Sequence, residues 1–166
     1  MCRNWTRIPK ARWIIVGVVA LVAAGAFAYL RSHGMPRAAW NALNDADQYE
    51  MLSLHPSLSK PEYHGHEILG QTIITDSATR ERLNEAFQSG ARANDGTMMA
   101  CFNPRHGIRV THAGVTTDFV VCFECRQVQV WRGNQKVAFF LVSDSPQPVF
   151  DNVLKSAGVP LAPREP

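Results

Sequence analysis

Alternating apolar and polar residues dominate the second half of this 166-residue chain. The alternation has a period of two, which is typical of half-buried strands, and it runs through four short segments. Ala113-Gly114 and Gly133-Asn134 interrupt it, and both dipeptides suit tight hairpin turns. We therefore expect an antiparallel meander over residues 108–112, 116–123, 127–131 and 136–142.

Further strands and helices complete the predicted domain. A possible helix cap, Asp76 or Ser77, follows a segment rich in β-branched residues, and Ser145 begins a second helical pattern. The predicted elements are strands over residues 67–75 and 97–102 and helices over 78–92 and from Ser145. This order predicts an α+β fold: a mostly antiparallel sheet of about five to six strands with two helices packed on one face.

An uncharged apolar run over residues 13–30 precedes the domain. As a helix, its 18 residues would reach roughly 27 Å, close to the roughly 30 Å of a bilayer core. Four cations precede the run, which favours a cytoplasmic N-terminus and an extracytoplasmic C-terminal domain. The run predicts a single-pass transmembrane helix in the inner membrane, with the lipid bilayer as its partner. The alternative is a signal peptide cleaved near Ala26 or Ala28, which would leave a secreted or periplasmic domain.

The segment between the apolar run and the sheet is expected to be a stalk helix and a breaker-rich linker. Helical spacing extends from Pro36 to about Leu52. His64 and His66 fall at the end of the linker, where we expect exposed side chains, with metal binding as the alternative. The predicted parts begin with a cytoplasmic basic segment (1–12) and an anchor or signal peptide (13–30). A stalk and linker (31–63), a globular domain (64–160) and a tail (161–166) follow.

The distribution of charge excludes one class of partner. The whole chain carries +3, but four of its seventeen basic residues lie before the apolar run. The remainder is close to neutral, and it lacks the positive surface that nucleic-acid binding requires. We therefore expect no nucleic-acid partner. The motifs of nucleotide binding, zinc proteases and serine hydrolases are also missing from the sequence.

Three cysteines and two histidines concentrate the candidate chemistry. Cys101, Cys122 and Cys125 with His106 would give tetrahedral Cys₃His coordination of zinc, and His112 is an alternative ligand. The two-residue gap of the CxxC motif brings two sulfurs to one ion if the chain turns or bulges between them. A closed site with four ligands would be structural. Zinc is the only cofactor that the sequence suggests.

Two other interpretations of the cysteines remain open. The CxxC pair could cycle between dithiol and disulfide, although its neighbours indicate a strand rather than the helix N-terminus usual for redox cysteines. Alternatively, one structural disulfide joins Cys101 to Cys122 or Cys125, and the third thiol is buried. With Cys2 in the cytoplasm, three exported thiols cannot all pair within one molecule.

The segment NPRHG, residues 103–107, predicts a connection between strands. At its tip, Arg105 could grip a carboxylate or phosphate, and His106 could titrate near neutral pH. Asn, Pro and Gly also build such a turn on their own, so both side chains could simply be solvated loop residues. The sequence thus gives a candidate binding loop and a plain alternative.

Three segments resemble a set of uncharacterised bacterial proteins, often exported, that share CF-x-PRHG and CFxC motifs. The segments read ACFNPRHGIR, DFVVCFECRQVQVW and SPQPVFDNVLKSAGVPLAP, and the resemblance covers roughly residues 54–163. It implies a common fold but no assigned activity. It also implies a shared role for Cys101, Arg105, His106, Cys122 and Cys125.

These features predict a membrane-anchored extracytoplasmic module with a binding or structural role. We expect it to engage envelope components or another protein through the loop at Arg105 and His106, with the cysteines holding that loop in place. The alternative is a thiol-redox or metal-dependent enzyme that uses the CxxC pair. The sequence favours no particular substrate.

Overall fold

The computed structural model describes residues 34–56 and 62–163, together with Val19. The chain divides into two compact units, residues 1–32 and 33–166, and the second contains every strand described below. Along the described chain the elements are α2 (Arg37–Asn44), β1 (Gln48–Leu54), β2 (Ile68–Ile73), α3 (Ser77–Ala93), β3 (His106–His112), β4 (Val115–Cys122), β5 (Gln127–Arg132), β6 (Gln135–Leu141) and α4 (Gln147–Ser156).

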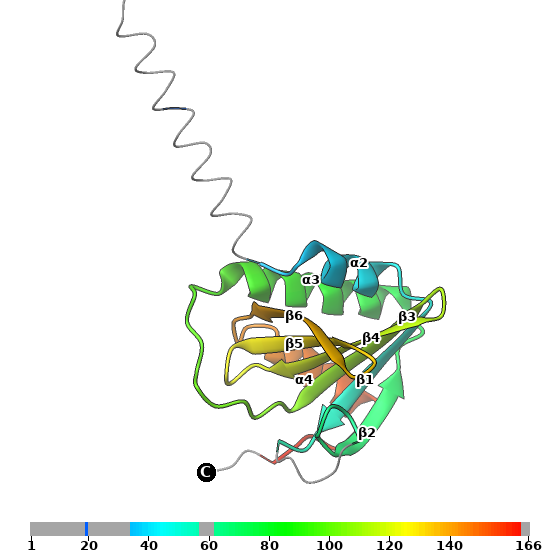
Figure 1. Cartoon of the computed structure of the whole chain (residues 1–166). Helices are drawn as coiled ribbons and strands as arrows, with labels where there is room; N and C mark the ends of the chain where they lie inside the picture. Colours follow the sequence, from blue (N-terminus) through cyan, green and yellow to red (C-terminus); the bar gives the residue numbers. More distant parts are fainter. Residues whose placement is uncertain (1–18, 20–33, 57–61, 164–166) are drawn as a thin grey trace, which may run out of the picture. The chain divides into compact units, whose positions relative to one another are not determined.

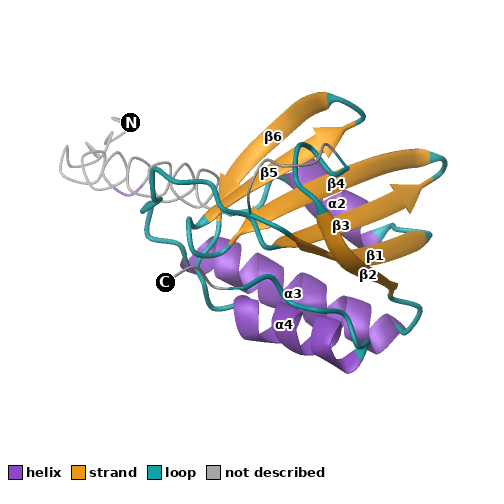
Figure 2. Cartoon of the chain, turned by 90° about the horizontal axis from the view of Figure 1, so that it is seen from below, coloured by secondary structure: helices purple, strands orange, loops and turns teal. Residues whose placement is uncertain are grey.

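The strands form one antiparallel sheet in the order β2-β1-β3-β4-β5-β6 (Figure 2). The predicted meander is confirmed in β3 to β6, and the two predicted turn dipeptides connect β3 to β4 and β5 to β6. At the first of these turns, Ala113 and Gly114 both have positive φ, as a tight hairpin turn requires. The hairpin of β1 and β2 extends the sheet beyond β3.

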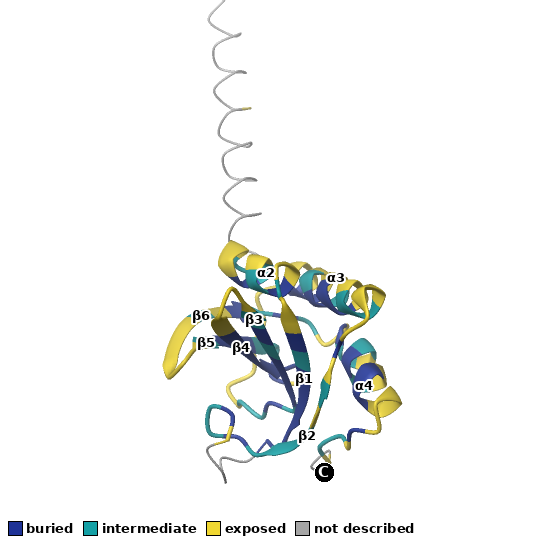
Figure 3. Cartoon of the chain, turned by 90° about the vertical axis from the view of Figure 1, so that its right-hand side faces the viewer, coloured by how far each residue is buried: buried dark blue, intermediate teal, exposed yellow. Residues whose placement is uncertain are grey.

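Helices α2, α3 and α4 all contribute to one core on a single face of the sheet, the helix face. Figure 2 shows α3 and α4 side by side along this face; in the view of Figure 1, α3 lies above the strands and α4 behind them. In Figure 3 the buried residues lie between helices and sheet. Phe87 of α3 lies at the centre, with ring centroids 5.4 to 6.5 Å from those of its aromatic neighbours. These neighbours are Phe119, Phe123, Phe140 and Phe150. The Asp76 carboxylate caps α3 by accepting a hydrogen bond from the Thr79 amide at 2.8 Å.

A second, smaller core covers the opposite face of the sheet, which we call the outer face. Residues 62–66, the clasp segment, place Tyr63 on this face beside Leu52, Leu54 and Val120. The Tyr63 hydroxyl donates a hydrogen bond to the Ile108 carbonyl at 2.7 Å. The clasp segment therefore belongs to the folded domain and does not lie outside it as a linker.

The predicted fold class needs correction in two respects. It placed two helices on the sheet, whereas three pack there, because Ala39 and Leu43 of α2 also enter the helix-face core. It also began with a membrane-spanning helix. Within the described residues, no helix is long and apolar enough to cross a membrane. The run over residues 13–30 that suggested such a helix lies outside the described residues, Val19 excepted.

The predicted stalk also needs correction, because most of it belongs to the sheet domain. The helix expected from Pro36 to Leu52 ends at Asn44, and Gln48–Leu54 form strand β1. Lying between β2 and β3, β1 buries side chains on both faces, so it lacks the one-sided alternation of an ordinary strand. The short strand expected over 97–102 does not form, since β1 takes the position beside β3.

Candidate functional site

The β4–β5 connection holds the CxxC pair. Cys122 ends β4, Cys125 lies in the turn that follows, and the Arg126 amide donates to the Phe123 carbonyl at 3.1 Å. The sulfurs of Cys122 and Cys125 lie at disulfide distance, with the two Cα atoms 5.2 Å apart. A turn between the two cysteines, which the zinc interpretation required, is present, and a disulfide was one of the predicted states.

The pairing of the cysteines differs from the predicted disulfide to Cys101. Cys101 is free and exposed, whereas the two bonded cysteines are buried. The physical reason is that Cys122 and Cys125 face each other across a tight turn, while Cys101 lies in the loop between α3 and β3. That loop nevertheless contacts the disulfide. The Met99 amide donates to the Cys125 carbonyl at 3.0 Å, and the Asn103 amide donates to the Cys125 sulfur at 3.1 Å.

His106 is not at a loop tip but begins strand β3 and is buried. Its Nε2 lies 2.8 Å from a carboxylate oxygen of Asp151 in α4. Its ring meets the edges of Phe123 and Phe150, at centroid distances of 5.2 and 5.9 Å. The predicted presentation of His106 to solvent is therefore wrong, because the strand begins earlier than expected and carries this side chain into the core.

The predicted Cys₃His zinc set is not assembled in this structure. His112 ends β3, the strand that His106 begins, and its Nδ1 lies 3.5 Å from an Asp47 carboxylate oxygen. Cys122 and Cys125 are bonded to each other. Among the described residues, no group of three histidine, cysteine or acidic side chains is arranged to hold a metal ion.

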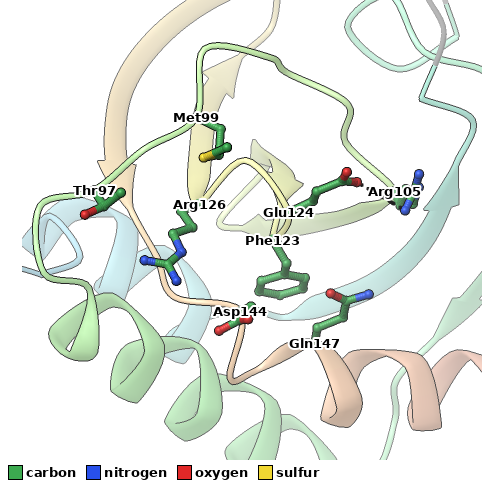
Figure 4. A pocket seen from close by; sticks show the side chains of 8 residues that line it. All are labelled: Thr97, Met99, Arg105, Phe123, Glu124, Arg126, Asp144 and Gln147. Atoms are coloured by element: carbon green, nitrogen blue, oxygen red, sulfur yellow. Dashed lines mark ion pairs between the residues drawn. The ribbon is translucent and has the colours of Figure 1, made fainter. Parts of the chain in front are cut away.

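An open hollow of about 650 Å³ lies beside the CxxC turn, and we call it the turn hollow. Figure 4 shows Arg126 reaching between Thr97 and Asp144, whereas Glu124 turns toward Arg105. The Arg105 guanidinium lies 3.3 Å from the Glu124 carboxylate. The hollow is lined by Thr97, Met99, Arg105, Phe123, Glu124, Arg126, Asp144 and Gln147.

Arg126 holds an unusual backbone conformation at this hollow. Its φ of 57° lies in the left-handed region, which costs a residue with a Cβ about 1 kcal/mol or more and which Gly or Asn usually occupies. The Arg126 side chain is about one third exposed and lies 3.6 Å from Asp95. Hydrogen bonds from Thr97, helped by the Arg126 charge, hold the pKa of the Asp95 carboxyl below its ordinary value. A charged guanidinium thus projects from a strained turn position.

A polar cluster that the sequence did not indicate lies on the outer face. His64 Nε2 lies 2.8 Å from an Asp118 carboxylate oxygen, and Arg109 donates to the same carboxylate at 2.9 Å. The His64 ring stacks on Trp131 with centroids 4.6 Å apart. His64 and His66 are therefore not exposed linker residues. Their contacts join positions far apart in the sequence, so no local pattern could reveal them.

No protein-family model, curated protein or solved structure matches this chain. The resemblance to exported bacterial proteins therefore stays a prediction. Function therefore has to be inferred from the turn hollow and from Cys101, Cys122 and Cys125.

Proposed function

We propose that this chain is an extracytoplasmic binding module whose turn hollow recognises an acidic segment of another protein. The observation that carries the proposal is the position of Arg126. Its guanidinium projects into a hollow beside a disulfide-closed turn, from a backbone conformation that favours Gly or Asn. Strained conformations of this kind persist where the surrounding structure enforces them, and they concentrate at binding and catalytic sites.

The disulfide stabilises the structure of this site. It closes the ring that contains Phe123 and Glu124, so it fixes the turn from which Glu124 and Arg126 project. Both sulfurs are buried, and buried cysteines of this kind are inert toward reagents in solution. Because the disulfide already orders the turn, ligand binding loses less conformational entropy, and this favours affinity.

The chemistry of the hollow favours a ligand with one carboxylate and apolar neighbours. Arg126 can bind a carboxylate through two parallel hydrogen bonds, and its exposed pairing with Asp95 at 3.6 Å is weak. Met99 and Phe123 provide apolar contact, and a flexible methionine adapts to different side chains. Glu124 and Asp144 would repel a second carboxylate nearby, which limits the number of acids in the ligand.

The proposed location is the extracytoplasmic side of the inner membrane. Four cations precede the apolar run over residues 13–30, and such a bias favours export of the C-terminal part. A disulfide persists in oxidising compartments and is rare in the cytosol. The proposed partner is therefore a protein of the cell envelope.

The test uses two capped peptides and the full-length chain in mild detergent. One peptide carries a single glutamate between leucines, and the other carries glutamine at that position. We expect the glutamate peptide to shift the amide NMR signals of Thr97, Met99 and Gln147 in a saturable way. Its affinity should exceed that of the glutamine peptide by roughly tenfold, because a hydrogen bond to a charged group is worth about 1.5 to 3 kcal/mol.

Arg126→Asn is the deciding variant, since Asn tolerates the left-handed conformation and lacks the charged guanidinium. It should abolish the preference for glutamate, whereas Arg132→Gln, at the far end of β5 and outside the hollow, should retain it. The proposal fails if neither peptide perturbs the hollow, or if Arg126→Asn still prefers glutamate.

A further inference from the structure

We infer that Cys101, Cys122 and Cys125 form a thiol–disulfide exchange site, in which the exposed Cys101 thiol attacks the buried disulfide and Cys122 becomes the free thiol. The inference does not depend on what the turn hollow binds. It rests on three observations: the path of the loop that carries Cys101, the surroundings of the Cys122 sulfur, and the exposure of the loop.

The loop that carries Cys101 wraps around Cys125. Met99 and Asn103 both donate amide hydrogen bonds to Cys125, the first to its carbonyl and the second to its sulfur, at 3.0 and 3.1 Å. Cys101 is two residues from each of them, so its Cα lies within about 7 Å of theirs. A disulfide requires a Cα separation of roughly 4.4 to 6.8 Å. A local movement of this loop is therefore enough to bring Cys101 to Cys125.

The Cys122 sulfur has partners for either form of a free thiol. It lies 3.3 Å from the Asn103 carbonyl oxygen, which can accept a hydrogen bond from an S–H group. The Cys125 amide donates to the same sulfur at 3.1 Å, and such a donor stabilises a thiolate. The site thus accommodates Cys122 as a leaving group, a property that a purely structural disulfide does not need.

The loop can move at little cost to the core. Residues 95–101 are all exposed and form no helix or strand, and segments with few buried contacts open at low free energy. Cys122 and Cys125 are 1% and 0% exposed, whereas Cys101 is accessible. The covering loop itself supplies the attacking thiol, so the exchange needs no reagent to enter the buried site.

The step balances without an external oxidant or reductant. Cys101 loses its proton to water, and its thiolate attacks the Cys125 sulfur. The Cys101–Cys125 bond forms as the Cys122–Cys125 bond breaks, and the electron pair remains on the Cys122 sulfur, which takes a proton from water. One disulfide and one thiol are present before and after. Because the loop also contributes Thr97 and Met99 to the turn hollow, the two isomers differ in the shape of that hollow.

Disulfide mapping of the full-length chain tests this inference. The protein is incubated at about pH 8.5, near the ordinary thiol pKa, and is then quenched in acid and alkylated. Cleavage after Arg105 and Glu124 separates the three cysteines for mass spectrometry. We expect a peptide pair linked through Cys101 and Cys125, with alkylated Cys122, and a faster approach to equilibrium as pH rises. If only the Cys122–Cys125 link appears throughout, the inference is wrong.

A trapped variant provides an independent measurement. In Cys122→Ser, two of the three remaining cysteines, Cys101 and Cys125, should form a disulfide, with an effective concentration on the order of 1 mM or more against glutathione. Its matched control carries Cys101→Ser and Thr116→Cys in addition to Cys122→Ser. The exposed thiol then lies near the start of β4, at the opposite end of the strand from position 122, and this control should stay reduced. Equal behaviour of variant and control would overturn the inference. If Cys122→Ser does not fold, the map of the unmodified protein decides.

Discussion

His66 shows how the outer-face core constrains a single residue. It lies in the clasp segment and is buried, although it is an ionisable side chain. Burial penalises the charged imidazole and lowers the pKa of His66 from its ordinary value of 6.5. Hydrogen bonds with the backbone of His55 and Pro56 oppose this effect on the pKa, and the electrostatic interaction with His64 adds to it. Folding therefore selects the neutral form of His66.

The stability of the domain should fall with decreasing pH because of His66. Because the pKa of His66 is lower in the folded than in the unfolded protein, the unfolded protein binds a proton more readily as pH falls. The corresponding stability is fully present above about pH 6.5, the unfolded value, and is lost as pH falls through the folded-state pKa. His66→Gln should reduce this loss between pH 7.5 and 5, as measured by urea midpoints at several pH values. His112→Gln, an exposed control at the end of β3, should lose as much as the unmodified protein. Equal losses in all three proteins would contradict this account.

At the scale of elements, the clasp segment and β3 fit each other through Gly107. A Cβ at Gly107 would lie 2.9 Å from Tyr63 Cε1 and 3.4 Å from Leu52 Cβ. The Tyr63 ring cannot retreat easily, because its hydroxyl is hydrogen-bonded to the Ile108 carbonyl and the Arg109 guanidinium lies over the ring, 5.0 Å from its centroid. The glycine is therefore a packing requirement rather than a flexible joint.

Gly107→Ala should lower the free energy of unfolding by about 1 to 3 kcal/mol, the usual cost of overpacking a core. Urea denaturation followed by circular dichroism measures this change. Val115→Ala, on the exposed start of β4, provides the control and should change stability by less than about 0.5 kcal/mol. A Gly107→Ala protein as stable as this control would show that the clasp segment does not pack on β3 as described.

The sequence predicted strands β3 to β6 and helices α3 and α4, and it missed strand β1. Strands β3 to β6 followed from alternation, whereas the turn inside the CxxC motif was only a condition of the zinc interpretation. Strand β1 was missed because the helical spacing that begins at Pro36 continues through its residues. The position of His106 could not be predicted, since its partner Asp151 lies on α4, far along the chain. Contacts between distant elements define this site, and no local pattern contains them.

At the scale of the whole described domain, the two faces of the sheet are covered in different ways. The helix face supplies the main core, and the outer face is covered by the clasp segment and its His64–Asp118–Arg109 cluster. The turn hollow lies where β4, β5, the α3–β3 loop and the start of α4 meet. The Cys122–Cys125 disulfide closes the turn at this junction. The central claim is that this bond holds the turn residues that line the proposed binding hollow.

Counting thiols tests that claim most directly. The full-length protein is isolated without reductant, quenched in acid, alkylated in denaturant and weighed by mass spectrometry, and its zinc content is measured in parallel. With one disulfide among four cysteines, the account predicts two labels per chain and no stoichiometric zinc. Four labels, or one zinc ion per chain, would show that Cys122 and Cys125 are not joined and would contradict the account.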